Sequence, residues 1–97
     1  MRFIIASDSS SFADRDRDTV TALLEGKGWS VWHWFPDLWL IDGAPDNLSM
    51  PDLRDEIVRI LPSSPKFMIM STEGRKDHSG YVQTSAIPWI KEHWNRR

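Results

Sequence analysis

The longest run of mainly apolar residues in the chain, residues 30–42, is divided in two by Pro36-Asp37 and predicts a β-hairpin. Proline and aspartate are typical of turns, and proline cannot donate a hydrogen bond to the ladder of a sheet. The segments on either side are rich in aliphatic and aromatic residues, as is expected for strands. With the bend at this pair, the predicted register places Phe35 opposite Leu38, Trp34 opposite Trp39, His33 opposite Leu40 and Trp32 opposite Ile41.

This register divides the hairpin into two faces, because side chains alternate across a strand. Both faces are apolar, whereas a half-exposed hairpin has one polar face, so both need cover. We expect the helices of the domain to cover one of them, and the C-terminal helix, a second subunit or another protein to cover the other. One face contains Val31, His33, Phe35, Leu38 and Leu40, and the other, here called the tryptophan face, contains Trp32, Trp34, Trp39 and Ile41.

The rest of the chain alternates between short apolar runs and segments with helical spacing of apolar residues. The runs at residues 2–7 and 66–72 do not alternate with polar residues, which predicts strands buried on both faces. A serine of the 9–11 loop is a candidate N-cap for the first helix. Helices are predicted over residues 12–25, over residues 50–61 after an N-cap at Ser49, and over residues 84–94, with a short strand or extended arm at residues 81–83.

The order of these elements is strand, helix, strand, strand, helix, strand, followed by a C-terminal appendage. This order predicts an α+β protein with the ferredoxin-like βαββαβ arrangement, in which two helices cover one face of a four-stranded antiparallel sheet. The length of 97 residues predicts a single domain with a core over about residues 2–72. The C-terminal arm and helix, residues 81–94, are the internal candidate to cover the open face of the sheet.

Composition narrows the classes of function. Twelve basic and 14 acidic side chains give a mildly acidic balance, which is not the electrostatic signature of non-specific nucleic-acid binding. The absence of cysteine excludes disulfides, thiolate metal sites and cysteine nucleophiles. No apolar run has the length of a signal peptide or a membrane span, so we expect a cytoplasmic protein. Six tryptophans are unusual in so short a chain.

Asp8, at the carboxyl end of the first predicted strand, is the candidate ligand for a divalent cation, especially if a dimer supplies a second copy. The simpler interpretation is that Asp8 caps or orders the serine loop that follows. The aspartates at positions 14, 16 and 18 lack the glycine of a calcium-binding loop and fit a solvated helix start. Arg75 and Lys76 are candidates for contact with a phosphate group.

The tryptophan face has three interpretations. An exposed tryptophan patch marks a protein interface more often than other sites. Trp89 and Trp94 of the last helix could instead fold back and bury the patch internally. Stacking of single-stranded bases on the rings ranks lower, because no basic surround accompanies them.

Short segments of the chain resemble SinR-like small proteins, which are related to the small subunit of the CRISPR adaptation complex. The resemblance spans residues 2–72 and implies a ferredoxin-like fold, dimerisation through sheet edges and, in some members, a metal-dependent nuclease whose ligand would fall on Asp8. The chain departs from the family pattern at Ser7, where tyrosine is common, and in its acidic balance, and both departures weigh against nuclease activity. The segments are Ile4-Ile5-Ala6-Ser7-Asp8, Trp32-His33-Trp34, Leu38-Trp39-Leu40-Ile41 and Leu53-Arg54-Asp55.

The sequence therefore supports two hypotheses of different class. The first is a small non-enzymatic module that needs no cofactor and binds a protein partner or a second copy of itself, through a sheet edge or through an aromatic face. The second is a nuclease or nucleic-acid-binding protein that uses Asp8 with Mg²⁺ or Mn²⁺ at a dimer seam. The residues of the predicted aromatic face are Trp32, Trp34, Trp39, Ile41, Trp89 and Trp94.

Overall fold

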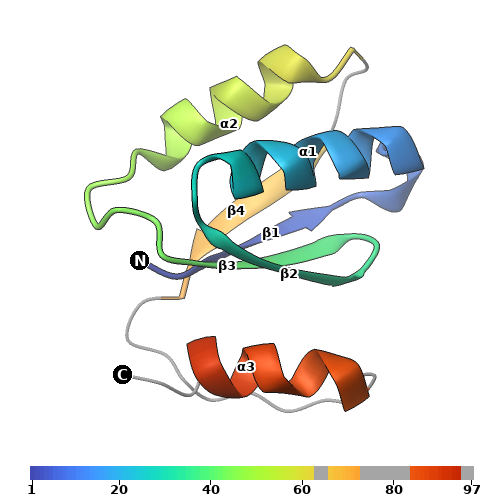
Figure 1. Ribbon diagram of the computed structural model, residues 1–97. Coiled ribbons are helices and arrows are strands. Elements are labelled where there is room, and N and C mark those ends of the chain that lie inside the picture. The colour runs from blue at the N-terminus through green and yellow to red at the C-terminus, as the bar shows by residue number, and fades with distance from the viewer. Residues whose placement is uncertain (63–65, 73–83, 95–97) are drawn as a thin grey trace.

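The structure is a computed structural model that describes residues 1–62, 66–72 and 84–94. Its described part contains a four-stranded antiparallel sheet and three α-helices, which confirms the prediction of an α+β protein (Figure 1). The elements are β1 (Phe3–Ser7), α1 (Asp14–Gly26), β2 (Ser30–Phe35), β3 (Leu38–Asp42), α2 (Met50–Ile60), β4 (Phe67–Ser71) and α3 (Ile87–His93), with short 3-10 turns η1 (Ser9–Ser11) and η2 (Thr84–Ala86).

The strand order in the sheet is β2-β3-β1-β4, and each strand is antiparallel to its neighbours. Helix α1 connects β1 to β2, and α2 follows β3. Figure 1 shows α1 and α2 on one side of the sheet and α3 on the other. The molecule therefore has three layers, with the C-terminal helix on the face that α1 and α2 leave open.

The main core lies between the sheet and the two helices α1 and α2. Alternate residues of β1 and β3 point into it, as the pleat of a strand requires. Val20 and Leu24 come from α1, and Leu53 and Ile57 come from α2, at the spacing that places side chains on one helix face. The sheet residues that are fully buried here are Phe3, Ile5, Trp39 and Ile41.

The N-terminal ends of α1 and α2 are each stabilised by a side chain. The hydroxyl of Ser49 accepts a hydrogen bond from the backbone N–H of Asp52, which confirms Ser49 as the N-cap of α2. Helix α1 begins two residues later than predicted, and its N-cap is Ala13 rather than a serine. The carboxylate of Asp16 compensates by accepting a hydrogen bond from the Ala13 N–H at 3.0 Å.

The predicted register of the hairpin is correct at the bend and wrong beyond it. Phe35 pairs with Leu38 as expected, but Trp32 pairs with Leu40 instead of Ile41. An irregularity between Trp32 and Phe35 shifts the ladder by one residue, as a β-bulge does. A shift of one residue exchanges the two faces of a strand, so Trp32 lies on the opposite face from Trp39 and Ile41.

One end of α3 is attached to β2. The indole N–H of Trp32 donates to the carbonyl of Ala86 at 3.2 Å, and the indole N–H of Trp89 donates to the hydroxyl of Ser30 at 3.1 Å. Both donors are tryptophans whose rings also supply apolar contact area. The region that precedes and begins α3 therefore covers Trp32, which is 2% exposed.

The other end of α3 is attached to β3 and to the residue before β1 by polar side chains. Nδ1 of His93 lies 2.7 Å from a carboxylate oxygen of Asp42. The buried guanidinium of Arg2 donates to the carbonyl of Trp94 at 2.8 Å and lies 5.4 Å from the centre of its ring. A carbonyl at the end of a helix is a favourable acceptor for a cation. The last helix thus covers part of the open sheet face, as predicted. On the same face Met68 and Met70 of the edge strand β4 stay exposed, so the prediction that residues 66–72 are buried on both faces is wrong.

Candidate interaction surface

The predicted tryptophan face does not exist as one surface. Trp39 and Ile41 lie in the core under α1 and α2, opposite Ile5 and Phe3 of β1, and both are fully buried. Trp32 is buried on the other face, and the stacked rings of Trp89 and His93 lie beside it in α3. The structure thus leaves Trp34, at 43% exposed, as the most accessible of the six predicted aromatic-face residues: Trp32, Trp34, Trp39, Ile41, Trp89 and Trp94.

Trp34 belongs to an aromatic surface at the end of the hairpin. Its neighbour Phe35 is 38% exposed, and Pro36 is exposed at the bend. Both aromatic residues follow the point at which the β2–β3 ladder becomes irregular. We call the surface formed by these residues and the start of α1 the hairpin-end surface; it comprises Asp14, Arg17, Asp18, His33, Trp34, Phe35 and Pro36.

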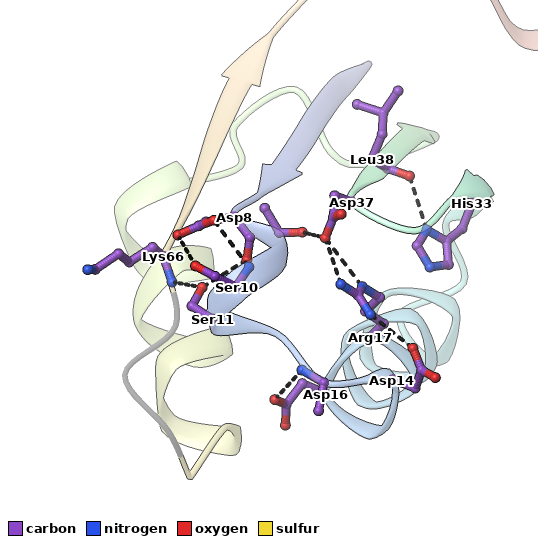
Figure 2. Close-up of polar contacts among 12 residues, drawn as sticks. Asp8, Ser10, Ser11, Asp14, Asp16, Arg17, His33, Asp37, Leu38 and Lys66 are labelled. Carbon is purple, nitrogen blue, oxygen red and sulfur yellow. Dashed lines mark hydrogen bonds and ion pairs between the residues drawn. The ribbon is translucent and has the colours of Figure 1, made fainter.

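The same residues line a pocket of about 250 Å³ between α1 and the hairpin. One of its lining residues, His33, is held in place by its ring, which stacks on the buried Trp39 with centroids 4.4 Å apart and planes 3° apart. Nδ1 of His33 lies 3.0 Å from the carbonyl of Leu38, and because a carbonyl only accepts, that nitrogen carries the proton. Figure 2 shows His33 and Arg17 close together at this end of the hairpin.

An ion-pair cluster holds α1 against the bend of the hairpin. The guanidinium of Arg17 contacts Oδ1 of Asp37 at 3.0 Å and Oδ1 of Asp14 at 2.9 Å (Figure 2). The hydroxyl of Ser7 donates to the same oxygen of Asp37 at 2.8 Å. Helix α1, strand β1 and the hairpin are thus linked through one carboxylate.

These contacts favour the charged forms of both partners. The hydrogen bond from Ser7, followed by the hydrogen bond and charge of Arg17, holds the pKa of Asp37 below its ordinary value. The hydrogen bond to Asp37 in turn raises the pKa of the Arg17 guanidinium. A carboxylate that accepts hydrogen bonds in its charged form resists protonation. Asp37 and Arg17 therefore both stay ionised over the whole physiological range.

The surroundings of Asp8 fit the simpler of its two interpretations. Its carboxylate accepts hydrogen bonds from the backbone N–H of Ser10 at 3.2 Å and from the Ser10 hydroxyl at 2.9 Å, and it caps the turn η1 (Figure 2). The Ser11 hydroxyl donates to the Asp8 carbonyl and accepts from the N–H of Lys66, which joins this turn to β4. Among the described residues no group of three acidic or histidine side chains could hold a metal ion.

The remaining candidates are placed as follows. Of the alternating aspartates, Asp16 is buried at the Ala13 cap and Asp14 pairs with Arg17. The carboxylate of Asp18 forms no hydrogen bond or ion pair with a described residue. Arg75 and Lys76 lie outside the described residues. In the described part of the chain, no helix combines the length and the apolar character that a bilayer crossing requires.

Sequence reasoning missed the pocket and the role of Arg17. A signal was present, because Asp37 at the bend and the charged first turns of α1 are adjacent if the first helix packs over the hairpin. The order of apolar and polar residues in the sequence, however, does not indicate which hairpin face that helix covers. Comparisons of the chain with family models, with curated proteins and with solved structures gave no match.

Proposed function

We propose that this chain is a small non-enzymatic interaction module that binds another protein through the hairpin-end surface. The observation that carries the proposal is that Trp34 stays 43% exposed at a pocket and Phe35, next to it in the chain, stays 38% exposed, while Trp32 and Trp39 of the same hairpin are buried. Tryptophan is enriched among the residues that supply most of the binding energy of protein interfaces.

The hairpin-end surface is also held in place before any partner arrives. Arg17 is fixed from two sides by Asp14 and Asp37, and His33 is fixed by its stack on Trp39. A surface whose side chains are already ordered loses less conformational entropy on binding than a flexible one. This rigidity supports a role in recognition rather than a merely incidental exposure of two aromatic rings.

We also propose that the fold is ferredoxin-like and that the SinR-like resemblance reflects this shared architecture. The strand order β2-β3-β1-β4, the antiparallel pairing and the position of α1 and α2 on one side support the assignment. The departure is α3, which covers part of the other face. On this basis the module resembles the family in the arrangement of its sheet, α1 and α2, and differs in that α3 covers part of the other sheet face.

The proposal is tested by site-specific photo-crosslinking in host cells. A benzophenone amino acid replaces Trp34 in one variant and Val58 in a control. Val58 lies on α2 and is 46% exposed, so it matches Trp34 in exposure and apolar character but lies on another surface. We expect one discrete crosslinked protein from position 34 and none of the same mass from position 58.

The crosslinked protein, once identified by mass spectrometry, is purified and its affinity is measured by calorimetry. Trp34→Ala should weaken binding by about tenfold or more, as truncation of a central interface aromatic does, and Val58→Ala should leave it unchanged. Equal crosslinking from both positions, or binding that ignores Trp34→Ala, would contradict the proposed function.

A further inference from the structure

The charge, the aromatic lining and the size of the pocket at the hairpin-end surface together favour one class of partner side chain. We infer that this pocket receives the cationic end of a lysine or arginine side chain of the partner protein. This inference rests on the proposed function and adds the chemistry of the contact. It is carried by the charge balance of the pocket, its aromatic rim and its size.

Among the described residues at the pocket, carboxylates outnumber guanidinium and ammonium groups. Asp14 and Asp18 line it, and Asp37 lies directly behind Arg17. The one guanidinium is already paired with Asp14 at 2.9 Å and with Asp37 at 3.0 Å, so its charge is compensated within the chain. A pocket with a net negative surround attracts a cation and repels phosphate or carboxylate ligands.

The carboxylate of Asp18 is available to a cation of the partner. Asp18 lies one turn beyond Asp14, and no described residue forms a hydrogen bond or an ion pair with its carboxylate. The helix dipole accounts for acidic residues in the first turn of α1, but its effect falls off within that turn. Asp18 lies beyond that first turn and lines the pocket together with Trp34.

The rim of the pocket supplies the second interaction that a cation needs. Trp34 lines the pocket and is 43% exposed, whereas the ring of Phe35 packs against Trp32 on the other face of the hairpin. An ammonium or guanidinium group is attracted to the face of an aromatic ring, and tryptophan is the strongest such partner. The aliphatic stem of lysine or arginine also packs on apolar surface while its charged end stays near water.

The size of the pocket agrees with one side chain. Its volume of about 250 Å³ lies below the range of roughly 300–1,000 Å³ that is typical of sites for cofactors and small molecules. A pocket that is small, acidic and lined by Trp34 is therefore suited to anchor a single basic residue within a larger protein contact.

The test uses nuclear magnetic resonance of the full chain with three small probes. Nα-acetyl-lysinamide and Nα-acetyl-argininamide carry the cation, and Nα-acetyl-norleucinamide has a neutral chain of similar length. We expect the two cationic probes to shift the indole resonance of Trp34 and the backbone resonances of residues 14–18, and the neutral probe to leave them in place. Shifts that are equal for all three probes, or absent for all three, would overturn the inference.

A charge-matched pair of variants gives the second readout. Asp14→Asn with Asp18→Asn should weaken binding of the lysine probe at least about fivefold, since two exposed charge contacts are lost. Asp52→Asn with Asp55→Asn on α2 changes the net charge equally and should have no effect. If the crosslinked partner depends on Trp34 but neither probe nor partner responds to the first pair, the proposed function stands and this inference fails.

Discussion

The two tryptophans of strand β2 provide a direct test of the layer arrangement. Trp32 is 2% exposed, its ring packs edge-on against Phe35 at 5.2 Å, and its N–H donates to the carbonyl of Ala86. Trp34, two residues along the same strand, is 43% exposed. Replacing each with alanine removes the same atoms from two very different environments.

The expected costs follow from these environments. Truncation of a buried tryptophan to alanine lowers the free energy of unfolding by about 3–5 kcal/mol, because apolar contacts are lost and a cavity remains. Trp32→Ala also leaves the Ala86 carbonyl without its donor, which costs about 1 kcal/mol more when that group stays buried. Trp34→Ala should cost about 1 kcal/mol or less, as surface substitutions do.

Urea denaturation followed by far-ultraviolet circular dichroism measures both values without relying on tryptophan fluorescence. Domains of this kind have a total stability of about 5–15 kcal/mol, so Trp32→Ala removes a large share of it. Its melting temperature should fall by at least about 12 °C, at about 4–8 °C for each kcal/mol. Equal losses for the two variants, or a larger loss for Trp34→Ala, would refute the assignment of Trp32 to the interior and Trp34 to the surface.

Three further predictions concern single polar groups. Ser49→Ala removes the N-cap of α2 and should lower the free energy of unfolding by about 1 kcal/mol in urea titrations, whereas Ser49→Asp, which restores an acceptor, should not. Because the pKa of Asp37 is lower in the folded chain than in the unfolded chain, its stabilising effect is present above about pH 4 and is lost as the pH falls through its folded value. Asp37→Asn should therefore flatten the fall in stability below about pH 4, and an unchanged slope would contradict the role of the cluster. Assays with single- and double-stranded nucleic acids in Mg²⁺ or Mn²⁺ should show no cleavage, since the carboxylate of Asp8 is occupied by Ser10, and cleavage that Asp8→Ala abolishes would support the nuclease hypothesis instead.

Local chemistry was enough to predict which segments form elements. The bend falls at Pro36-Asp37, and Ser49 is the N-cap of α2, as predicted from their turn and capping preferences. The hairpin is bounded by Gly28 and Gly43, which adopt φ angles of +83° and +97° that other residues rarely tolerate. These features depend on a few neighbouring residues, so they can be read from the chain.

The sequence by itself thus determined the order and type of the elements, the antiparallel hairpin and the need for a cover on both of its faces. Only the tertiary structure decided the shift of the ladder between Trp32 and Phe35, and that shift decides which tryptophans are buried. The reason is physical: a one-residue register change costs little locally, and its sign is set by packing against α1 on one face and α3 on the other. The pairing of Arg17 with Asp37 likewise joins residues 20 positions apart and exists only once α1 lies over the hairpin.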